Sequence, residues 1–199
     1  MTMNISFRSL ILIAALAVLT GCSTTHPVMD DYGQYLANNA GERKFEAVKA
    51  GDQYFLPEAT QNHSYKFRSA TVGYANVWLV EFGKILDATM QSKDVVDALG
   101  KVTKASTETQ GAGNMIVFDL QKYSFENFGA HIVLTISVKN KQGDIFKKTY
   151  SADGTGQGGK MFWAGAFGMH NAIQQSTKLA MDEIISNFIR DLKAAPTGG

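Results

Sequence analysis

Residues 154–160, Gly-Thr-Gly-Gln-Gly-Gly-Lys, have types and spacing close to those of a phosphate site. They fit the G-x-x-x-x-G-K half of a phosphate-binding loop, whose backbone N–H groups surround the phosphate oxygens. Met161 follows, where such a loop carries the Ser or Thr that binds Mg²⁺. The preceding segment contains Lys147 and Lys148 and is predicted to be an exposed edge strand, whereas the loop needs a buried parallel strand. We therefore predict a glycine turn, with no nucleotide and no other cofactor.

The other reactive side chains do not form a recognisable site. Metal sites and nucleophilic serines have typical local spacings, such as His at i and i+4 or G-x-S-x-G, and none occurs here. Asp182 and Glu183 are adjacent in a predicted helix, where successive side chains diverge by about 100°. The sequence predicts a non-enzymatic protein without catalytic residues or a metal site. The four histidines, none of which has the spacing of a metal site, are His26, His63, His131 and His170.

The strongest chemical signal is residues 19–22, Leu-Thr-Gly-Cys, at the end of an apolar run. Arg8 precedes the run, which spans residues 10–19. This arrangement resembles the signal peptide of bacterial lipoproteins. The resemblance implies that the chain is cleaved between Gly21 and Cys22, that a diacylglycerol is attached to the thiol of Cys22, and that the new amino group is acylated.

Two other interpretations of the apolar run fit less well. Ten residues of helix span about 15 Å, roughly half of a bilayer core. Ordinary secretion would leave Cys22 as an unpaired thiol, because it is the only cysteine. One acyl chain anchors a protein only marginally, so the three chains of a finished lipoprotein should hold it firmly.

Ser23 stands where Asp retains lipoproteins of this class in the inner membrane, which implies a location in the outer membrane, on its periplasmic face.

Charge argues against nucleic acid as a partner. Lys plus Arg number 19 and Asp plus Glu number 18, and the leader contains only Arg8 of these. The mature chain is therefore electrically balanced and lacks the basic surplus of a nucleic-acid binder or a polybasic membrane patch.

We divide the chain into a signal peptide (1–21), the lipidated cysteine with a tether (22–63), a periplasmic domain (64–193) and a disordered tail (194–199). The tether is predicted because its apolar residues have no sustained period and glycines interrupt it. Short helices remain possible around Tyr32 to Leu36 and from Glu42 to Ala50.

In the domain, alternation predicts a strand from Tyr65 to Val72. Asn76 is a candidate cap for a helix that reaches Met90, and Ser92 and Gly100 bound a second, shorter helix. The apolar stripe of the first helix contains Trp78, Phe82, Ile85, Leu86 and Thr89.

After a polar loop at residues 101–113, the period changes to two. Strands are predicted at 116–125, with a bulge near Gln121 and Lys122, at 131–139 and at 144–151. In the middle strand Ile132, Leu134, Ile136 and Val138 should point inward, and His131, Thr135, Ser137 and Lys139 toward water. A long amphipathic helix is expected from about Asn171 to Leu192.

These elements predict an α+β fold: a two-layer domain with a three- to four-stranded antiparallel sheet covered by two helices, behind a lipidated tether. Residues 64–193 resemble small periplasmic lipoprotein domains of the YajG and PelC types and the auxiliary lipoproteins of ABC transport systems. The resemblance implies an accessory or interaction subunit of an envelope transport, secretion or assembly system, with a protein partner or a homo-oligomer. A periplasmic binder of small ligands or glycans, with a pocket near the aromatic segment, is the alternative.

That aromatic segment, residues 161–169, is the candidate interface. Two roles compete: its rings pack beneath the final helix, or they form the binding surface of an oligomer or partner. Gly165 and Gly168 favour mobility and hence the interface. The candidate interface residues are Met161, Phe162, Trp163, Phe167 and Met169.

Overall fold

The structure, a computed structural model, describes residues 23–108 and 113–195, without the side chains of residue 71 and of residues 158–166. Its elements in chain order are β1 (Thr24–Pro27), α2 (Tyr32–Asn38), β2 (Gln53–Phe55), α3 (Glu58–Gln61), β3 (Ser64–Phe67), the 3₁₀ turn η1 (Ala70–Val72), β4 (Asn76–Glu81), α4 (Phe82–Gln91), α5 (Lys93–Leu99), β5 (Thr103–Lys104), β6 (Met115–Glu126), β7 (Gly129–Asn140), β8 (Gly143–Asp153) and α6 (Gly158–Ala194).

The strands form two mixed sheets. The larger has the order β5-β2-β6-β7-β8, in which β6, β7 and β8 are antiparallel and β2 is parallel to both of its neighbours. The smaller has the order β1-β4-β3, with β1 parallel and β3 antiparallel to β4. The predicted α+β class is confirmed. Three of the predicted antiparallel strands are β6, β7 and β8, to which β2 and β5 add in parallel, whereas the strand predicted from Tyr65 is β3 of the smaller sheet.

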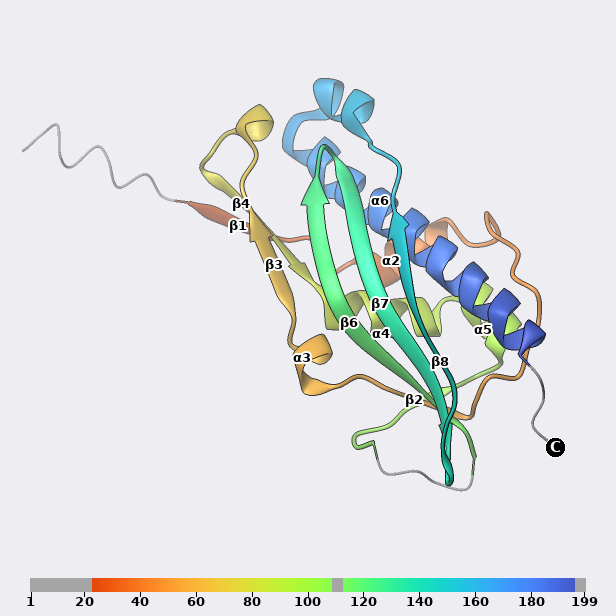
Figure 1. Ribbon diagram of the computed structural model, residues 1–199. Coiled ribbons are helices and arrows are strands. Elements are labelled where there is room, and N and C mark those ends of the chain that lie inside the picture. Colours follow the sequence, from red (N-terminus) through yellow and green to blue (C-terminus); the bar gives the residue numbers. More distant parts are fainter. Residues whose placement is uncertain (1–22, 109–112, 196–199) are drawn as a thin grey trace, which may run out of the picture.

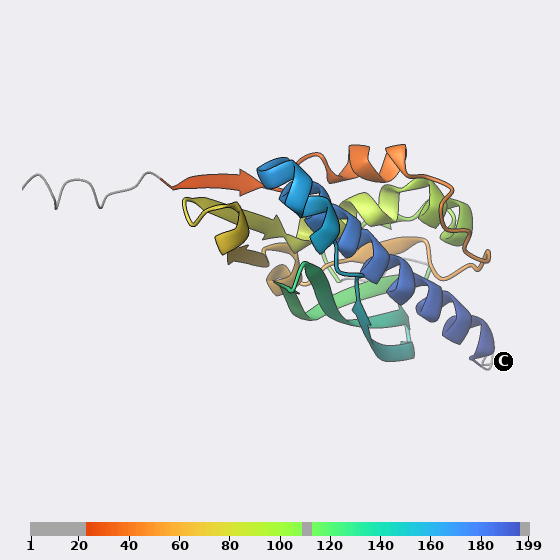
Figure 2. The same ribbon diagram turned by 90° about the horizontal axis from the view of Figure 1, so that it is seen from above.

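Helices cover one face of the larger sheet, as predicted. α6 packs against β7 and β8, and Figures 1 and 2 show α4 and α6 on the same side of the strands. The ring of Phe188 on α6 meets Phe146 on β8 at 5.7 Å between centroids, and Phe82 at the start of α4 lies 5.9 Å from Tyr123 on β6. The core therefore lies between the inner face of the sheet and these two helices.

The strand register agrees with the predicted alternation. The pairing of β6 with β7 shifts between Leu120 and Lys122, where a bulge was predicted. Thr135 and Ser137 do lie on the outer face of β7, but they are buried, contrary to prediction. β7 is flanked by β6 and β8, so their side chains cover it, and the Thr135 hydroxyl lies 2.8 Å from that of Thr149.

Residues 23–63 correct the predicted tether, because the structure builds them into the domain. They contribute β1, α2, β2 and α3, so the α2 turn anticipated around Tyr32 is present, whereas residues 42–50 form no helix. Each of these elements is at most seven residues long, too short to show a period. Their buried side chains include Val28, Met29, Tyr32, Leu36, Tyr54 and Leu56.

The predicted helix from Asn76 was wrong in its first turn. Asn76–Glu81 is β4, the central strand of the smaller sheet, and α4 begins only at Phe82. Trp78 and Val80 are buried and alternate with half-buried neighbours, which is the period of a strand. The spacing from Trp78 to Phe82 is also that of a helical turn. Only the pairing with β1 and β3 shows that this segment is a strand and not a helix.

α6 begins earlier than predicted. Residues 161–169 were expected to be an irregular, mobile segment, but they belong to the first turns of a helix that starts at Gly158. The shorter helix α5 lies between Ser92 and Gly100, as predicted, and Gly100 ends it with a positive φ of 80°.

Candidate functional site

The predicted site residues have different fates. Gly21 and Cys22, and the side chains of Met161, Phe162 and Trp163, lie outside the described residues. Phe167 is 84% exposed, whereas Met169 is 1% exposed and belongs to the core. Phe167 is therefore available to a partner, and the inclusion of Met169 in the interface was wrong.

β1 begins at Thr24, two positions after the predicted lipid attachment at Cys22. Thr24 N donates to Ala75 O at 2.9 Å, and Val28 N donates to Leu79 O at 3.0 Å, so both ends of the strand are bonded to the chain around β4. Val28 is fully buried. The chain is thus fixed in the fold from Thr24 onward.

A stacked histidine adds to this attachment. The ring of His26 lies on that of Trp78, with centroids 4.7 Å apart and an interplanar angle of 22°. His26 Nε2 lies 2.8 Å from Asn76 Oδ1, and Asn76 Nδ2 donates to Val72 O. His26 was considered as a metal ligand from sequence; here its partners are an indole and an amide.

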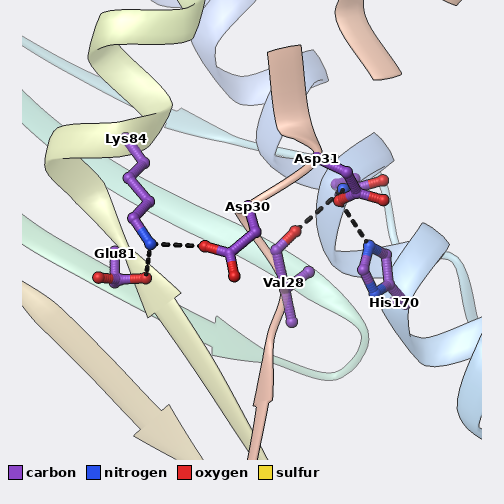
Figure 3. A network of polar contacts seen from close by, with 7 residues as sticks. Val28, Asp30, Asp31, Glu81, Lys84 and His170 are labelled. Atoms are coloured by element: carbon purple, nitrogen blue, oxygen red, sulfur yellow. Dashed lines mark hydrogen bonds and ion pairs between the residues drawn. The ribbon is translucent and has the colours of Figure 1, made fainter. Parts of the chain in front are cut away.

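A polar network joins the end of β1 to α6 (Figure 3). Gln174 Nε2 on α6 lies 2.9 Å from Val28 O and 2.6 Å from Asp31 Oδ1. His170 Nε2, one turn earlier on α6, lies 3.0 Å from the same oxygen of Asp31. Gln174 is buried, so its amide needs these acceptors.

A second branch of the network joins the same turn to α4. Lys84 Nζ lies 2.5 Å from Asp30 Oδ1 and also bonds to the Glu81 carboxylate (Figure 3). Hydrogen bonds to the carboxylates of Asp30 and Glu81 raise the pKa of Lys84 above its ordinary value. The turn between β1 and α2 is therefore held by two helices.

The glycine loop has a structural explanation. Gly154 is buried against α6, and a Cβ at this position would lie 2.0 Å from Ser176 O. Ser176 Oγ in turn accepts a hydrogen bond from Ala130 N at 2.7 Å. β8 is an edge strand of the larger sheet, as its lysines predicted. Gly154 thus permits the close approach of the chain to α6.

A polar cavity of about 420 Å³ opens beside this loop. The turn between β6 and β7 borders it and holds Asn127 and Phe128 at positive φ. On the outer face, His131 Nδ1 bonds to the Asp153 carboxylate. The lining includes Lys122, Ser124, Glu126, His131, Asp153 and Gly156.

Sequence reasoning missed the row of Ser124, His131 and Asp153. The three are direct cross-strand neighbours on β6, β7 and β8, but among the described contacts no hydrogen bond joins Ser124 to His131. The row is thus not an assembled catalytic triad. The sequence alone does not show this row, because the register of the strands sets which residues lie side by side, and these residues are distant in the chain.

Asp182 and Glu183 occupy different environments, in agreement with the predicted divergence of adjacent side chains on a helix. Glu183 is exposed, whereas Asp182 is half-buried and lies 2.7 Å from Lys178. Burial raises the pKa of Asp182, and the hydrogen bond from Lys178 opposes that rise. The pair therefore does not converge on one site.

Two further findings bear on the site. Within residues 23–108 and 113–195, no three or more His, Cys, Asp and Glu side chains are grouped so that they could hold a metal ion. None of the helices in this part of the chain has both the length and the hydrophobicity needed to cross a bilayer.

No protein-family model and no curated protein matches the chain. Among solved structures it is similar to protein XCC0632 of family DUF330 from Xanthomonas campestris, with a TM-score of 0.44 and 10% identity over 75% of this chain and 89% of that one. An uncharacterized protein gives a TM-score of 0.39 and 11% identity over 75% and 99%. Hypothetical protein CT253 from Chlamydia trachomatis gives a TM-score of 0.28 and 10% identity, over 41% of this chain and 55% of that one. Likenesses this distant carry no argument about function.

Proposed function

We propose that the protein is a lipid-anchored lipoprotein of the outer membrane, facing the periplasm, and a non-enzymatic accessory subunit of an envelope transport, secretion or assembly system. The observation that carries the proposal is the Leu-Thr-Gly-Cys motif at residues 19–22, directly before a folded domain. The resemblance to YajG-type, PelC-type and ABC auxiliary lipoproteins remains part of this proposal.

The structure supports an interaction role at one position. Phe167 on α6 is 84% exposed, more than any other large hydrophobic side chain in the described part of the chain, and aromatic residues are enriched at binding surfaces. Its neighbour Met169 is buried, so the helix that carries Phe167 is fixed to the core. A rigid helix that presents an aromatic ring suits docking onto another surface of the envelope.

The test is the mass of the mature amino-terminal peptide from the protein expressed in its native envelope, with separation of inner and outer membranes. Cys22 that carries a diacylglycerol and an amide-linked acyl chain, in the outer-membrane fraction, supports the proposal. An unmodified Cys22, or a chain that starts elsewhere, contradicts it. Crosslinking after detergent extraction then tests for a partner or a homo-oligomer.

The cavity beside the glycine loop favours a second candidate function, the binding of a small polar ligand. It holds both signs of charge, from Lys122 and Glu126, and a histidine paired to Asp153. A thermal-shift screen of sugars and sugar phosphates tests it, with His131→Ala as the matched control. A ligand that raises the melting temperature of the unaltered protein but not of the variant supports this function; the absence of any shift contradicts it.

A further inference from the structure

The anchoring point and the folded domain are separated by very little chain. Thr24 is already bonded to Ala75, and it follows Cys22 by two residues. Two residues span at most about 7 Å. If Cys22 carries lipid, as proposed above, the end of the smaller sheet must therefore lie at the bilayer surface. This inference rests on that proposed function and deepens it.

The attachment also restricts how the domain can turn on its anchor. β1 is held by parallel pairing with β4, by the stacking of His26 on Trp78 and by the network around Asp31. A strand held along its length transmits its direction to the domain, unlike a flexible tether. The lipid therefore fixes which end of the molecule faces the membrane.

Exposed aromatic rings occur at this end. Figures 1 and 2 both show β1, η1 and the first turns of α6 together at one end of the molecule, and η1 contacts α6. Tyr74, in the loop between η1 and β4, is 69% exposed, and Phe167, near the start of α6, is 84% exposed. The Arg68 guanidinium donates to Tyr74 O and so holds the loop in place. Of the four large exposed hydrophobic residues in the described part of the chain, these two are the most exposed.

We propose that this end, with Tyr74 and Phe167, rests on the lipid headgroups of the bilayer into which Cys22 is inserted. Tyr is enriched at the membrane interface, which accommodates both its apolar body and its polar tip, and Phe is typical of apolar faces buried at the boundary between headgroups and acyl chains. The mature chain is balanced in charge and has no polybasic patch, so the contact is apolar rather than electrostatic. The acyl chains hold the protein at the membrane, and the two rings orient it.

The test is hydroxyl-radical footprinting of the acylated full-length protein in phosphatidylethanolamine–phosphatidylglycerol vesicles, compared with the unacylated Cys22→Ala protein in solution. We expect oxidation of Tyr74 and Phe167 to fall at least about fivefold on the vesicles, because the interface excludes water from the rings. Ile145, which is 51% exposed on β8, is the internal control and should be oxidised equally in both samples. Protection should persist in about 0.5 M salt, since it does not depend on charge.

The outcomes separate the two proposals. Acylated protein that floats with the vesicles but leaves Tyr74 and Phe167 fully oxidised overturns this inference and leaves the lipoprotein proposal intact. Protein that is not acylated overturns both. Protection that disappears when the protein is diluted on the vesicle surface shows contact with a second copy and also overturns the inference. The variant Tyr74→Ser/Phe167→Ser should float as well as the unaltered protein but lose protection of the backbone amides of residues 73–76, measured by hydrogen exchange.

Discussion

At the scale of single residues, Gly154 shows how a residue that suggests phosphate chemistry can serve packing. We expect Gly154→Ala to lower the free energy of unfolding by about 2–3 kcal/mol, because a Cβ 2.0 Å from Ser176 O forces the chain away from α6. Urea denaturation monitored by circular dichroism measures the change.

Gly156→Ala is the matched control in the same loop. Its Cβ would meet Asn127 O at 3.3 Å, a contact that a small shift relieves, so the loss should stay below about 1 kcal/mol. Equal losses in the two variants would show that the loop responds to lost glycine flexibility rather than to the contact with α6.

His63 should make stability depend on pH. Burial lowers its pKa from 6.5, and its Nε2 has no hydrogen-bond partner among the described residues. The unfolded chain then binds the proton more tightly than the folded one. The contribution is thus fully present above pH 6.5 and is lost as the pH falls from 6.5 through the lower pKa of the folded state.

We expect the free energy of unfolding of the unaltered protein to decrease as the pH falls below about 6.5, and His63→Gln to show a shallower decrease. Denaturation at a series of pH values checks this, because the other titrating groups are common to both proteins. If the free energy of unfolding fell equally with pH in the two proteins, His63 would be excluded as the source of the pH dependence.

At the scale of elements, two adjacent carboxylates make different contributions to the docking of β1. Asp31 accepts from the buried Gln174 and contacts His170, whereas Asp30 forms an exposed ion pair with Lys84. Asp31→Ala should lower the free energy of unfolding by about 1–2 kcal/mol, because it removes an acceptor from a buried amide.

Asp30→Ala should lower the free energy of unfolding by less than about 1 kcal/mol, as is usual for the loss of an exposed ion pair. Denaturation of the two variants in parallel gives both values. A larger loss for Asp30 than for Asp31 would place the main attachment of this turn on α4 instead of α6.

At the scale of the whole molecule, the residue after the lipidated cysteine should determine which membrane the protein reaches. Ser23→Asp should leave the protein acylated and folded but retain it in the inner membrane, as Asp does at this position in the lipoprotein class that the chain resembles. Density-gradient separation of the two membranes measures the distribution. Ser23→Asn, similar in size but uncharged, should remain in the outer-membrane fraction; its retention in the inner membrane would remove the carboxylate from the explanation.

Cys22→Ala should release the whole domain into the soluble periplasmic fraction, since it removes the only thiol that can be acylated. Fractionation, with the circular dichroism spectrum of the released protein as a check on folding, decides the outcome. A membrane-bound variant would show that another part of the chain holds the protein at the membrane.

The sequence by itself determined the elements whose signal is local. β7 alternates over twelve residues between flanking strands, and α6 carries an apolar stripe over many turns, so their periods are visible without any partner. The bulge near Gln121 and the glycine that ends α5 are also local features of the backbone. The leader motif at residues 19–22 is the same kind of signal, and its chemistry remains a prediction.

Only the tertiary structure decided the features that depend on distant parts of the chain. β1 pairs with β4 about fifty residues later, and Asp31 meets Gln174 on the last helix, so neither the strand nor the network has a local pattern. Phe167 and Met169 are two residues apart in one helix, about 200° around its axis, so the core covers one and leaves the other in solvent. Composition cannot distinguish the two, because burial is set by which face of the helix meets the sheet.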